Sequence, residues 1–181
     1  MKRDDLTAGS VIRDVTIEDA PSICVIYNHY VQHTHVTFEE TPVEVAEMAG
    51  RISATTSIGL PWLVYEEDTR VLGYAYASPW KSRSAYRYSL ESTVYVKARE
   101  TLKGVGTALY GALLDRLLAL DIHAVTAGIA LPNPVSIALH RKMGFEKVAH
   151  FKQVGFKFER WIDVAYWEWL RESGRSGSSD E

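Results

Sequence analysis

The segment from Val94 to Leu109 constrains the fold more than any other part of the sequence. Its apolar start is typical of a strand, and Gly104 and Gly106 then open a segment whose leucines recur at helical spacing. A strand that runs through a glycine-rich turn into a helix places unpaired backbone N–H groups at the positive end of that helix, with no side chain to block an anion. We therefore predict an α/β fold with an anion-binding turn that suits a pyrophosphate.

A glycine pair at the start of a helix is weak evidence by itself. Two glycines are equally consistent with a tight turn and close packing of the helix on the sheet. The sequence has no G-x-x-x-x-G-K-[ST] motif, and no G-x-G-x-x-G followed by an acidic residue after the next strand. These absences disfavour a P-loop nucleotidase and a dinucleotide-binding fold.

Composition narrows the class of protein further. The chain has 181 residues, 46% of them hydrophobic, which suits one domain with a full core. Its formal net charge of −3 argues against binding to nucleic acid or to an anionic membrane. The single cysteine, Cys24, permits neither an internal disulfide nor a cysteine-based zinc site. With no signal-peptide pattern and no long apolar run, we expect a cytoplasmic protein.

The expected secondary structure alternates between strands and helices. Strands are expected at 11–15, 61–65, 71–77, 86–96, 124–130, near 146–151 and at 161–170. Helices are expected from 16 to about 32, from Thr41-Pro42, after Gly104, and from Asn133 to about Met143. We predict a mixed sheet of about seven strands flanked by about four helices, antiparallel early and parallel around the central strand–helix–strand unit. This domain would span 11–170, with flexible termini at 1–10 and 172–181.

Two further motifs identify a family resemblance. Asn133-Pro-Val-Ser136 opens a helix that ends at Gly144-Phe145, and Glu91 lies in the strand that leads to the glycine turn. With that turn, they resemble the GNAT superfamily of acetyl-CoA-dependent N-acetyltransferases, in which [QR]-x-x-G-x-[GA] holds the CoA pyrophosphate. Thr101 stands where the family usually has Gln or Arg, which shifts more of the pyrophosphate binding onto backbone amides, Lys103 and Arg99.

Several runs are similar to phosphinothricin acetyltransferases in particular, above all Leu90-Glu-Ser-Thr-Val-Tyr-Val96 and Pro79-Trp-Lys-Ser-Arg83. The resemblance implies acetyl transfer to the α-amine of phosphinothricin, methionine sulfoximine or methionine sulfone by direct attack in a ternary complex, and it implies a homodimer. The residues that it implies for acetyl-CoA are Val94, Tyr95, Val96, Arg99, Leu102, Lys103, Gly104, Val105, Gly106, Thr107, Asn133 and Ser136. Around Val94 to Val96 it implies a bulge whose backbone binds the pantetheine arm and the thioester oxygen.

Acetyl transfer needs a base for the ammonium and an acid for the leaving thiolate. The resemblance assigns Glu91 as the base, and a carboxylate among apolar strand residues has a raised pKa that suits this task. The alternative is an ion pair with Arg83 or Arg87. By the resemblance, His140 stands where most of the family has a tyrosine that protonates the thiolate, and Tyr110 is a second candidate for a contact with the thiolate or the carbonyl. A structural hydrogen bond for His140 and a core position for Tyr110 are the competing interpretations.

The loop after Pro79 is the expected acceptor site. Arg83, with Tyr86 and Lys81, would bind a doubly anionic amino-acid analogue, and Phe38 would form a wall of the same pocket. A solvated basic loop is the alternative. The histidines at 29, 33 and 35 lack the spacing and carboxylate partners of a metal site, so we expect none.

Two other functions remain open from the sequence. One is a protein or peptide N-terminal acetyltransferase of the same fold, which would need an open groove rather than a cationic loop. The other is a non-catalytic acyl-CoA-binding sensor, against which the combination of Glu91 and His140 argues.

Overall fold

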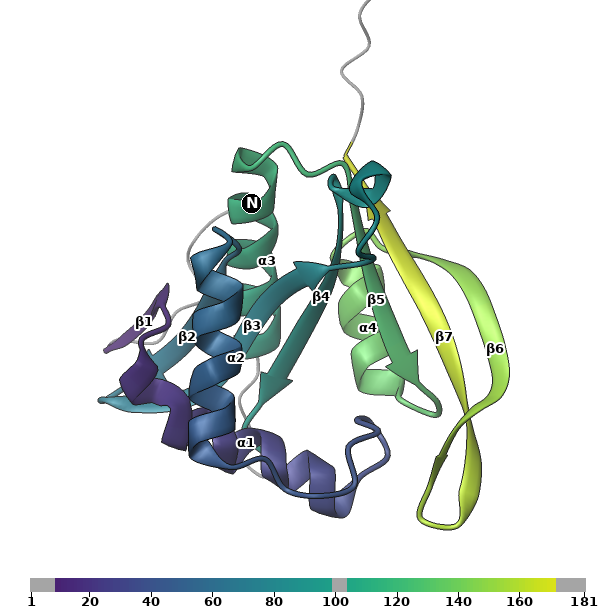
Figure 1. Ribbon diagram of the computed structural model, residues 1–181, viewed down its shortest axis with the longest axis horizontal. Coiled ribbons are helices and arrows are strands. Elements are labelled where there is room, and N and C mark those ends of the chain that lie inside the picture. Colours follow the sequence, from purple (N-terminus) through teal and green to yellow (C-terminus); the bar gives the residue numbers. More distant parts are fainter. Residues whose placement is uncertain (1–8, 99–103, 172–181) are drawn as a thin grey trace, which may run out of the picture.

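Seven strands and four α-helices make up the described part of the chain, residues 9–98 and 104–171 of a computed structural model (Figure 1). The strands are β1 (Ser10–Asp14), β2 (Trp62–Glu67), β3 (Arg70–Pro79), β4 (Ser89–Val96), β5 (Ala124–Ala130), β6 (Glu146–Lys157) and β7 (Arg160–Leu170). The helices are α1 (Ala20–His33), α2 (Val45–Ser57), α3 (Val105–Ala119) and α4 (Pro134–Lys142). One sheet runs in the order β1-β2-β3-β4-β5-β7-β6, which confirms the predicted mixed α/β fold.

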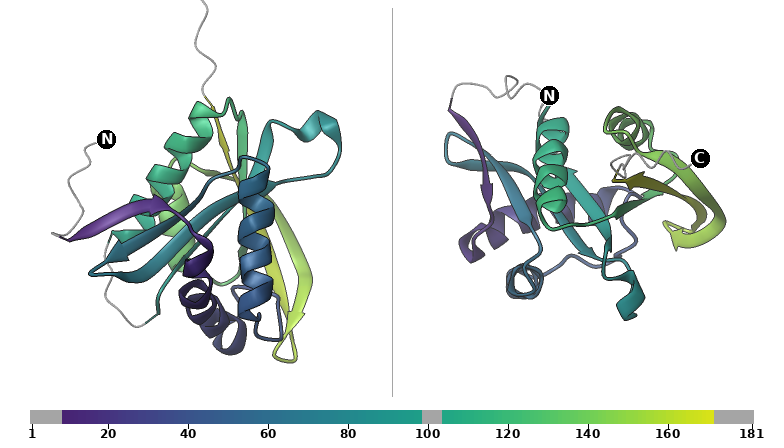
Figure 2. Two further views of the ribbon diagram at one scale, coloured as in Figure 1. Left: turned by 60° about the vertical axis from the view of Figure 1, so that its left-hand side comes forward. Right: turned by 90° about the horizontal axis from the view of Figure 1, so that it is seen from above.

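Helices cover both faces of this sheet. α1 and α2 lie on one face, and α3 and α4 lie on the other (Figure 2). In β2, Trp62 and Val64 pack toward α1 and α2, whereas Leu63 and Tyr65 pack toward α3. Because side chains alternate along a strand, a strand covered on both faces must be apolar throughout, which explains this unbroken run of large apolar residues.

The sheet splits between β4 and β5. These strands pair in parallel only from Ser89 to Glu91, opposite Ala124 to Thr126. Beyond this point they diverge, and β5 continues alongside β7 alone (Figure 1). From Ser92 to Val96, one edge of β4 therefore has no neighbouring strand among the described residues, and this edge becomes a wall of the site described below.

The structure corrects two expected element starts. α2 begins at Val45 rather than at Thr41-Pro42. The Asn28 side chain donates to the carbonyl oxygen of Val43 at 2.9 Å and accepts from its N–H at 2.8 Å, which holds this stretch outside a helix. β4 begins at Ser89 rather than at 86, because Ser84–Tyr86 forms a 3₁₀ turn.

Two expectations about strand geometry also change. The pairing of β3 with β4 runs without a register shift from Pro79↔Leu90 to Gly73↔Val96, so the expected bulge at 94–96 is wrong on this side of β4. Register shifts occur elsewhere, between Tyr65 and Glu66 of β2 and at two places in β6, the larger of them between Phe151 and Gly155. β6 consequently extends to Lys157, well past its expected end at 151.

Candidate active site

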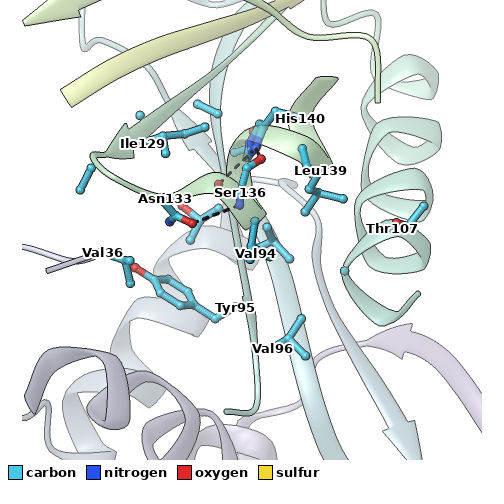
Figure 3. A pocket seen from close by; sticks show the side chains of 18 of the residues that line it. Val36, Val94, Tyr95, Val96, Thr107, Ile129, Asn133, Ser136, Leu139 and His140 are labelled. Atoms are coloured by element: carbon cyan, nitrogen blue, oxygen red, sulfur yellow. Dashed lines mark hydrogen bonds between the residues drawn. The ribbon is translucent and has the colours of Figure 1, made fainter. Parts of the chain in front are cut away.

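A cleft of about 720 Å³ opens where β4 and β5 part (Figure 3). Its walls are the far half of β4, the first turn of α3, the end of β5 and one side of α4. The predicted cofactor residues that line it are Val94, Tyr95, Val96, Gly104, Gly106, Thr107, Asn133 and Ser136. Val105 is instead buried in the core behind the cleft. Arg99, Leu102 and Lys103, together with Thr101, lie outside the described residues.

The open edge of β4 forms one long wall of the cleft. Val94 and Val96 pack toward α3, whereas Tyr95 faces the α1 side of the sheet. The Tyr30 hydroxyl donates to the carbonyl oxygen of Val96 at 2.5 Å. This hydrogen bond satisfies the Val96 carbonyl at one end of the open edge. The backbone groups of β4 before Val96 stay available to pair with an extended ligand.

The N-terminus of α3 forms the second wall. Gly104 is the residue before the helix and has φ of +94°, a conformation that glycine adopts without a steric penalty. A Cβ there would meet nothing within 4 Å, and Gly106 also borders the cleft. The first amides of a helix have no partner within it, and they carry the positive end of its dipole. This turn therefore has the character of an anion site.

α4 closes the cleft on the opposite side, where Asn133, Ser136 and His140 face Val94 of β4 (Figure 3). The Asn133 side chain accepts from the N–H of Ser136 at 3.1 Å and thereby caps the helix. One turn later, His140 lies against the same wall, with Nδ1 2.7 Å from the carbonyl oxygen of Ser136.

His140 and Tyr110, predicted as alternatives, belong to one hydrogen-bonded chain. Since a carbonyl oxygen only accepts, Nδ1 of His140 carries the proton, and Nε2 accepts from the Tyr110 hydroxyl at 3.0 Å. The Tyr110 oxygen lies 2.5 Å from the Ser92 hydroxyl, which in turn lies 3.1 Å from the carbonyl oxygen of Thr126. The chain thus connects α4, α3, β4 and β5 behind the cleft.

Burial sets the protonation state of this chain. It lowers the pKa of His140, against a smaller raising effect from the Ser136 carbonyl. Burial raises the pKa of Tyr110 well above its usual range, so the phenol stays protonated. A neutral imidazole and a neutral phenol therefore coexist, and the imidazole is the only member of this pair that borders the cleft.

Glu91 lies at the point where the two strands begin to part. Its carboxylate packs over Gly128 of β5, a residue that itself lines the cleft. Burial raises the pKa of Glu91, while the nearby Lys81 charge and the backbone amide of Gly128 oppose this effect. A half-buried carboxyl with a raised pKa is a suitable proton acceptor, and neither Arg83 nor Arg87 pairs with it in the described structure.

The predicted acceptor loop is largely exposed. Lys81 lies 5.3 Å from the Trp80 ring centroid, and the Trp80 and Tyr86 rings meet edge to face at 5.2 Å. Arg83 precedes the 3₁₀ turn and is exposed. None of the three predicted residues lines the cleft. Only Lys81 acts on the site, through its charge on Glu91.

Phe38 lies on the other side of the site, in the loop that joins α1 to α2. Its ring lies against Gly155 of β6, where a Cβ would come within 2.2 Å of a ring carbon. Two residues earlier, Val36 lines the cleft. Lys157 donates to the carbonyl oxygen of Thr37. We call residues 34–44 the crossing loop: they join α1 to α2, and Thr37 and Phe38 contact the β6–β7 hairpin.

The sequence did not predict three residues of this region: Ser92 in the hydrogen-bonded chain, and Gly128 and Tyr166 beside Glu91, where a Cβ built on Gly128 would lie 3.5 Å from the Tyr166 hydroxyl oxygen. Ser92 had a usable signal, since it lies on the same strand face as Val94 and Val96 and is a lone hydroxyl on an apolar face. The other two offered none, because their relevance depends on which strands are neighbours. The described residues contain no group of His, Cys, Asp and Glu that could hold a metal. Within these residues, no helix is long and apolar enough to cross a membrane.

Comparison with known proteins shows the family to which this chain belongs. The family model for an acetyltransferase (GNAT) domain matches residues 12–166. A phosphinothricin N-acetyltransferase of Streptomyces coelicolor is 38% identical over 165 residues, covering 90% of this chain and 96% of that protein. An L-methionine sulfoximine/L-methionine sulfone acetyltransferase of Pseudomonas paraeruginosa is 37% identical over 166 residues, covering 91% and 96%.

A solved structure of the same family has a similar fold. A GNAT superfamily phosphinothricin acetyltransferase from Sinorhizobium meliloti, determined in complex with acetyl-CoA, has a TM-score of 0.88 and 38% sequence identity. The match covers 96% of this chain and 95% of that one.

Proposed function

Because this chain belongs to the GNAT family of acetyltransferases and is an acetyl-CoA-dependent N-acetyltransferase, we propose that it acetylates the α-amine of a small amino-acid analogue. Phosphinothricin, methionine sulfoximine and methionine sulfone are the acceptors that we propose, since relatives that act on them match over most of the chain. Reaction would take place in the cytoplasm, by direct attack of the amine on the thioester.

One observation carries this proposal. Gly128 lines the cleft, and its backbone amide interacts with the carboxylate of Glu91, whose Oε1 would lie 3.3 Å from a Cβ at this position. A donor in the cleft and a base at Glu91 therefore meet at a single glycine, where no side chain separates them. This is the arrangement that amine acetylation needs, because the nitrogen must lose its proton next to the thioester carbon.

The cleft offers matching groups for each part of the donor. The α3 N-terminus at Gly104 and Gly106 would bind the pyrophosphate, and the open edge of β4 would pair with the pantetheine arm. A backbone N–H on that edge, in the stretch from Val94 to Val96, would stabilise the oxyanion that forms as the amine attacks. Acetyl-CoA itself supplies the activated acyl group.

Proton transfers would complete the reaction. Glu91 takes a proton from the ammonium, and the freed lone pair attacks the thioester carbon. The C–S bond then breaks; the nitrogen loses its second proton as the amide forms, and the thiolate gains one and leaves as a thiol. We propose that His140 relays this proton, giving its Nδ1 proton to the sulfur and taking the one from the nitrogen, while the Tyr110 hydroxyl keeps its own proton and holds Nε2 of the imidazole that borders the cleft.

A covalent acetyl-enzyme is not part of this proposal. Cys24 is 4% exposed and packs in the core between α1 and α2, apart from the cleft. Burial also raises the pKa of its thiol, which disfavours the nucleophilic thiolate. The expected initial-rate pattern is therefore that of a ternary complex, with lines that intersect rather than run parallel.

We also propose that the protein is a homodimer. The β6–β7 hairpin forms the edge of the sheet and exposes the large apolar side chains Val148, Phe151, Val154, Phe156, Phe158 and Trp161. Exposed apolar surface at a sheet edge is usually buried in an interface. The same edge of a second copy would bury it symmetrically. Light scattering would show twice the chain mass of 20.4 kDa, and Trp161→Lys would shift the protein to the monomer.

The function is tested by an acceptor panel with acetyl-CoA, following release of free thiol. Phosphinothricin, methionine sulfoximine and methionine sulfone should rank above proteinogenic amino acids in kcat/KM, and peptides with a free N-terminus should rank lowest. A peptide at the head of the ranking would replace this proposal with N-terminal acetylation. Absence of turnover with every amino acid would refute it.

A further inference from the structure

Tyr166 of β7 lies beside Glu91 over the backbone of Gly128. A Cβ built on Gly128 would lie 3.3 Å from Oε1 of Glu91 and 3.5 Å from the hydroxyl oxygen of Tyr166. Both polar groups therefore converge on one position, and the lack of a side chain at 128 is what allows them to do so.

The backbone and one neighbouring ring fix the tyrosine in this place. Tyr166 pairs with Gly128 of β5 on one side and with Ala149 of β6 on the other. Its ring meets Phe151 edge to face, with centroids 5.8 Å apart and an angle of 88° between the planes. Held between two strands, the ring keeps its hydroxyl near the carboxylate, on the same side of Gly128.

The other groups around Glu91 have partners or are exposed. Tyr76 of β3 and Tyr110 of α3 face it, but Tyr76 interacts with Thr93 and Tyr110 belongs to the His140 chain. Lys81 reaches it from an exposed loop, where solvent weakens a charge interaction. The amide of Gly128 is the backbone donor.

The Tyr166 hydroxyl differs from these groups. It has no hydrogen-bond partner among the residues that the structure describes. Burial and the Glu91 charge both raise its pKa, so it remains a donor at neutral pH. A protonated hydroxyl next to a carboxylate is an available hydrogen-bond donor to it.

With the proposed role of Glu91 as its premise, we propose that Tyr166 is a positioning residue for this base. Its hydroxyl, which has no partner in the described structure, donates a hydrogen bond to the ionised carboxylate when the acceptor binds and holds it toward the acceptor nitrogen above Gly128. The tyrosine keeps its own proton throughout, and the proton that leaves the ammonium goes to the carboxylate of Glu91.

Tyr166→Phe removes only the hydroxyl. Tyr88→Phe is the matched control, because the Tyr88 ring is exposed and lies in the loop before β4. Loss of a donor to the carboxylate raises the pKa of Glu91, so the acidic limb of the kcat/KM profile should move to higher pH. At neutral pH, kcat should fall about tenfold while KM for acetyl-CoA stays constant. The control should match the unaltered enzyme.

Two measurements separate this inference from the proposed function. In a Glu91→Gln background, Tyr166→Phe should lower kcat no further; an equal loss in both backgrounds would show that the tyrosine does not act through Glu91. The second measurement needs no acceptor. Titration of ¹³C-glutamate-labelled protein, with Glu91 identified by its loss in Glu91→Gln, should show a higher pKa in Tyr166→Phe. An unchanged pKa would overturn the inference even if the enzyme acetylates every acceptor.

Discussion

Lys157 of β6 donates a hydrogen bond from Nζ to the carbonyl oxygen of Thr37, 2.8 Å away and 120 residues earlier in the chain. The lysine is only 2% exposed. A hydroxyl–hydroxyl contact of 2.8 Å between Tyr27 and Thr37 secures the same residue to α1. The crossing loop is thus fixed at Thr37 from both halves of the molecule, and its neighbours Val36 and Phe38 take their positions from this point.

Replacement of Lys157 by Met tests this attachment. Loss of a hydrogen bond from a charged donor should lower the free energy of unfolding by about 1–3 kcal/mol. Because Phe38 of the crossing loop is the proposed wall of the acceptor pocket, KM for the acceptor should rise more than kcat falls; Val36 of the same loop lines the donor cleft, so KM for acetyl-CoA should rise by a smaller factor. Lys152→Met, at an exposed lysine of the same strand, is the control. Equal rises in both KM values would mean that the loop does not act on the acceptor.

Gly155→Ala tests whether Phe38 is a wall of the acceptor pocket. The new Cβ would come within 2.2–2.3 Å of the Phe38 ring, so the ring must move; since it is 41% exposed, it has room to do so. Stability should change by less than about 1 kcal/mol, whereas the ranking of acceptors by side-chain length should change. Gly50→Ala, where a Cβ meets nothing within 4 Å, should leave the ranking as it is. The same ranking in Gly155→Ala would remove Phe38 from the pocket.

Local patterns in the sequence predict the elements well, but they do not predict the contacts between elements. The strand at 124–130 and the helix after Gly104 are confirmed, since each has a continuous apolar pattern and a clear turn signal. The start of α2 is predicted too early, because Asn28 binds the backbone of Val43 from another helix.

The same limit applies to the site. The walls of the cleft formed by β4 and the start of α3 could be predicted to lie together, because a short motif within one strand–turn–helix unit contains them. The Glu91–Gly128–Tyr166 grouping could not, because it depends on β7 lying next to β5, and nothing local in the sequence gives that sheet order. The contact of Lys157 with Thr37 depends on the same order.

Gly104→Ala tests the anion site at the start of α3. A side chain at φ of +94° costs about 1–2 kcal/mol in backbone strain, and no clash adds to it. We expect this loss of stability together with weaker acetyl-CoA binding in calorimetry. Gly59→Ala is a matched control, since its φ is +78° and its Cβ also meets nothing, but it lies in the α2–β2 loop outside the cleft. Equal affinities in both variants would argue against pyrophosphate binding at this turn.

Glu91→Gln tests the base. With no proton acceptor at this position, kcat at neutral pH should fall about a hundredfold. The raised pKa of Glu91 also predicts that kcat/KM of the unaltered enzyme falls on acidification, as this carboxylate becomes protonated. The fall in kcat/KM on acidification should be absent from the pH profile of Glu91→Gln. Rates that match the unaltered enzyme at every pH would exclude Glu91 from the role.

His140 gives a pH-dependent stability. Its pKa is lowered in the folded protein, so the unfolded chain binds a proton first as the pH falls below the ordinary value of about 6.5. The folded state therefore loses stability on acidification through and below this pH, and His140→Gln should lose less over the same range. Urea unfolding at several pH values measures the difference. Parallel stability curves would show that the imidazole is not held neutral.

The split between β4 and β5 has a consequence for the lifetime of the protein. Only three residue pairs of β4 and β5 are paired as neighbouring strands, so a donor that pairs with the open edge of β4 would add contacts between the two sides of the sheet. By mass action, such a ligand favours the native state more strongly as its concentration rises. The concentration of acetyl-CoA in the cell would thus set how long each molecule resists proteolysis, as well as the rate at which it acetylates its acceptor.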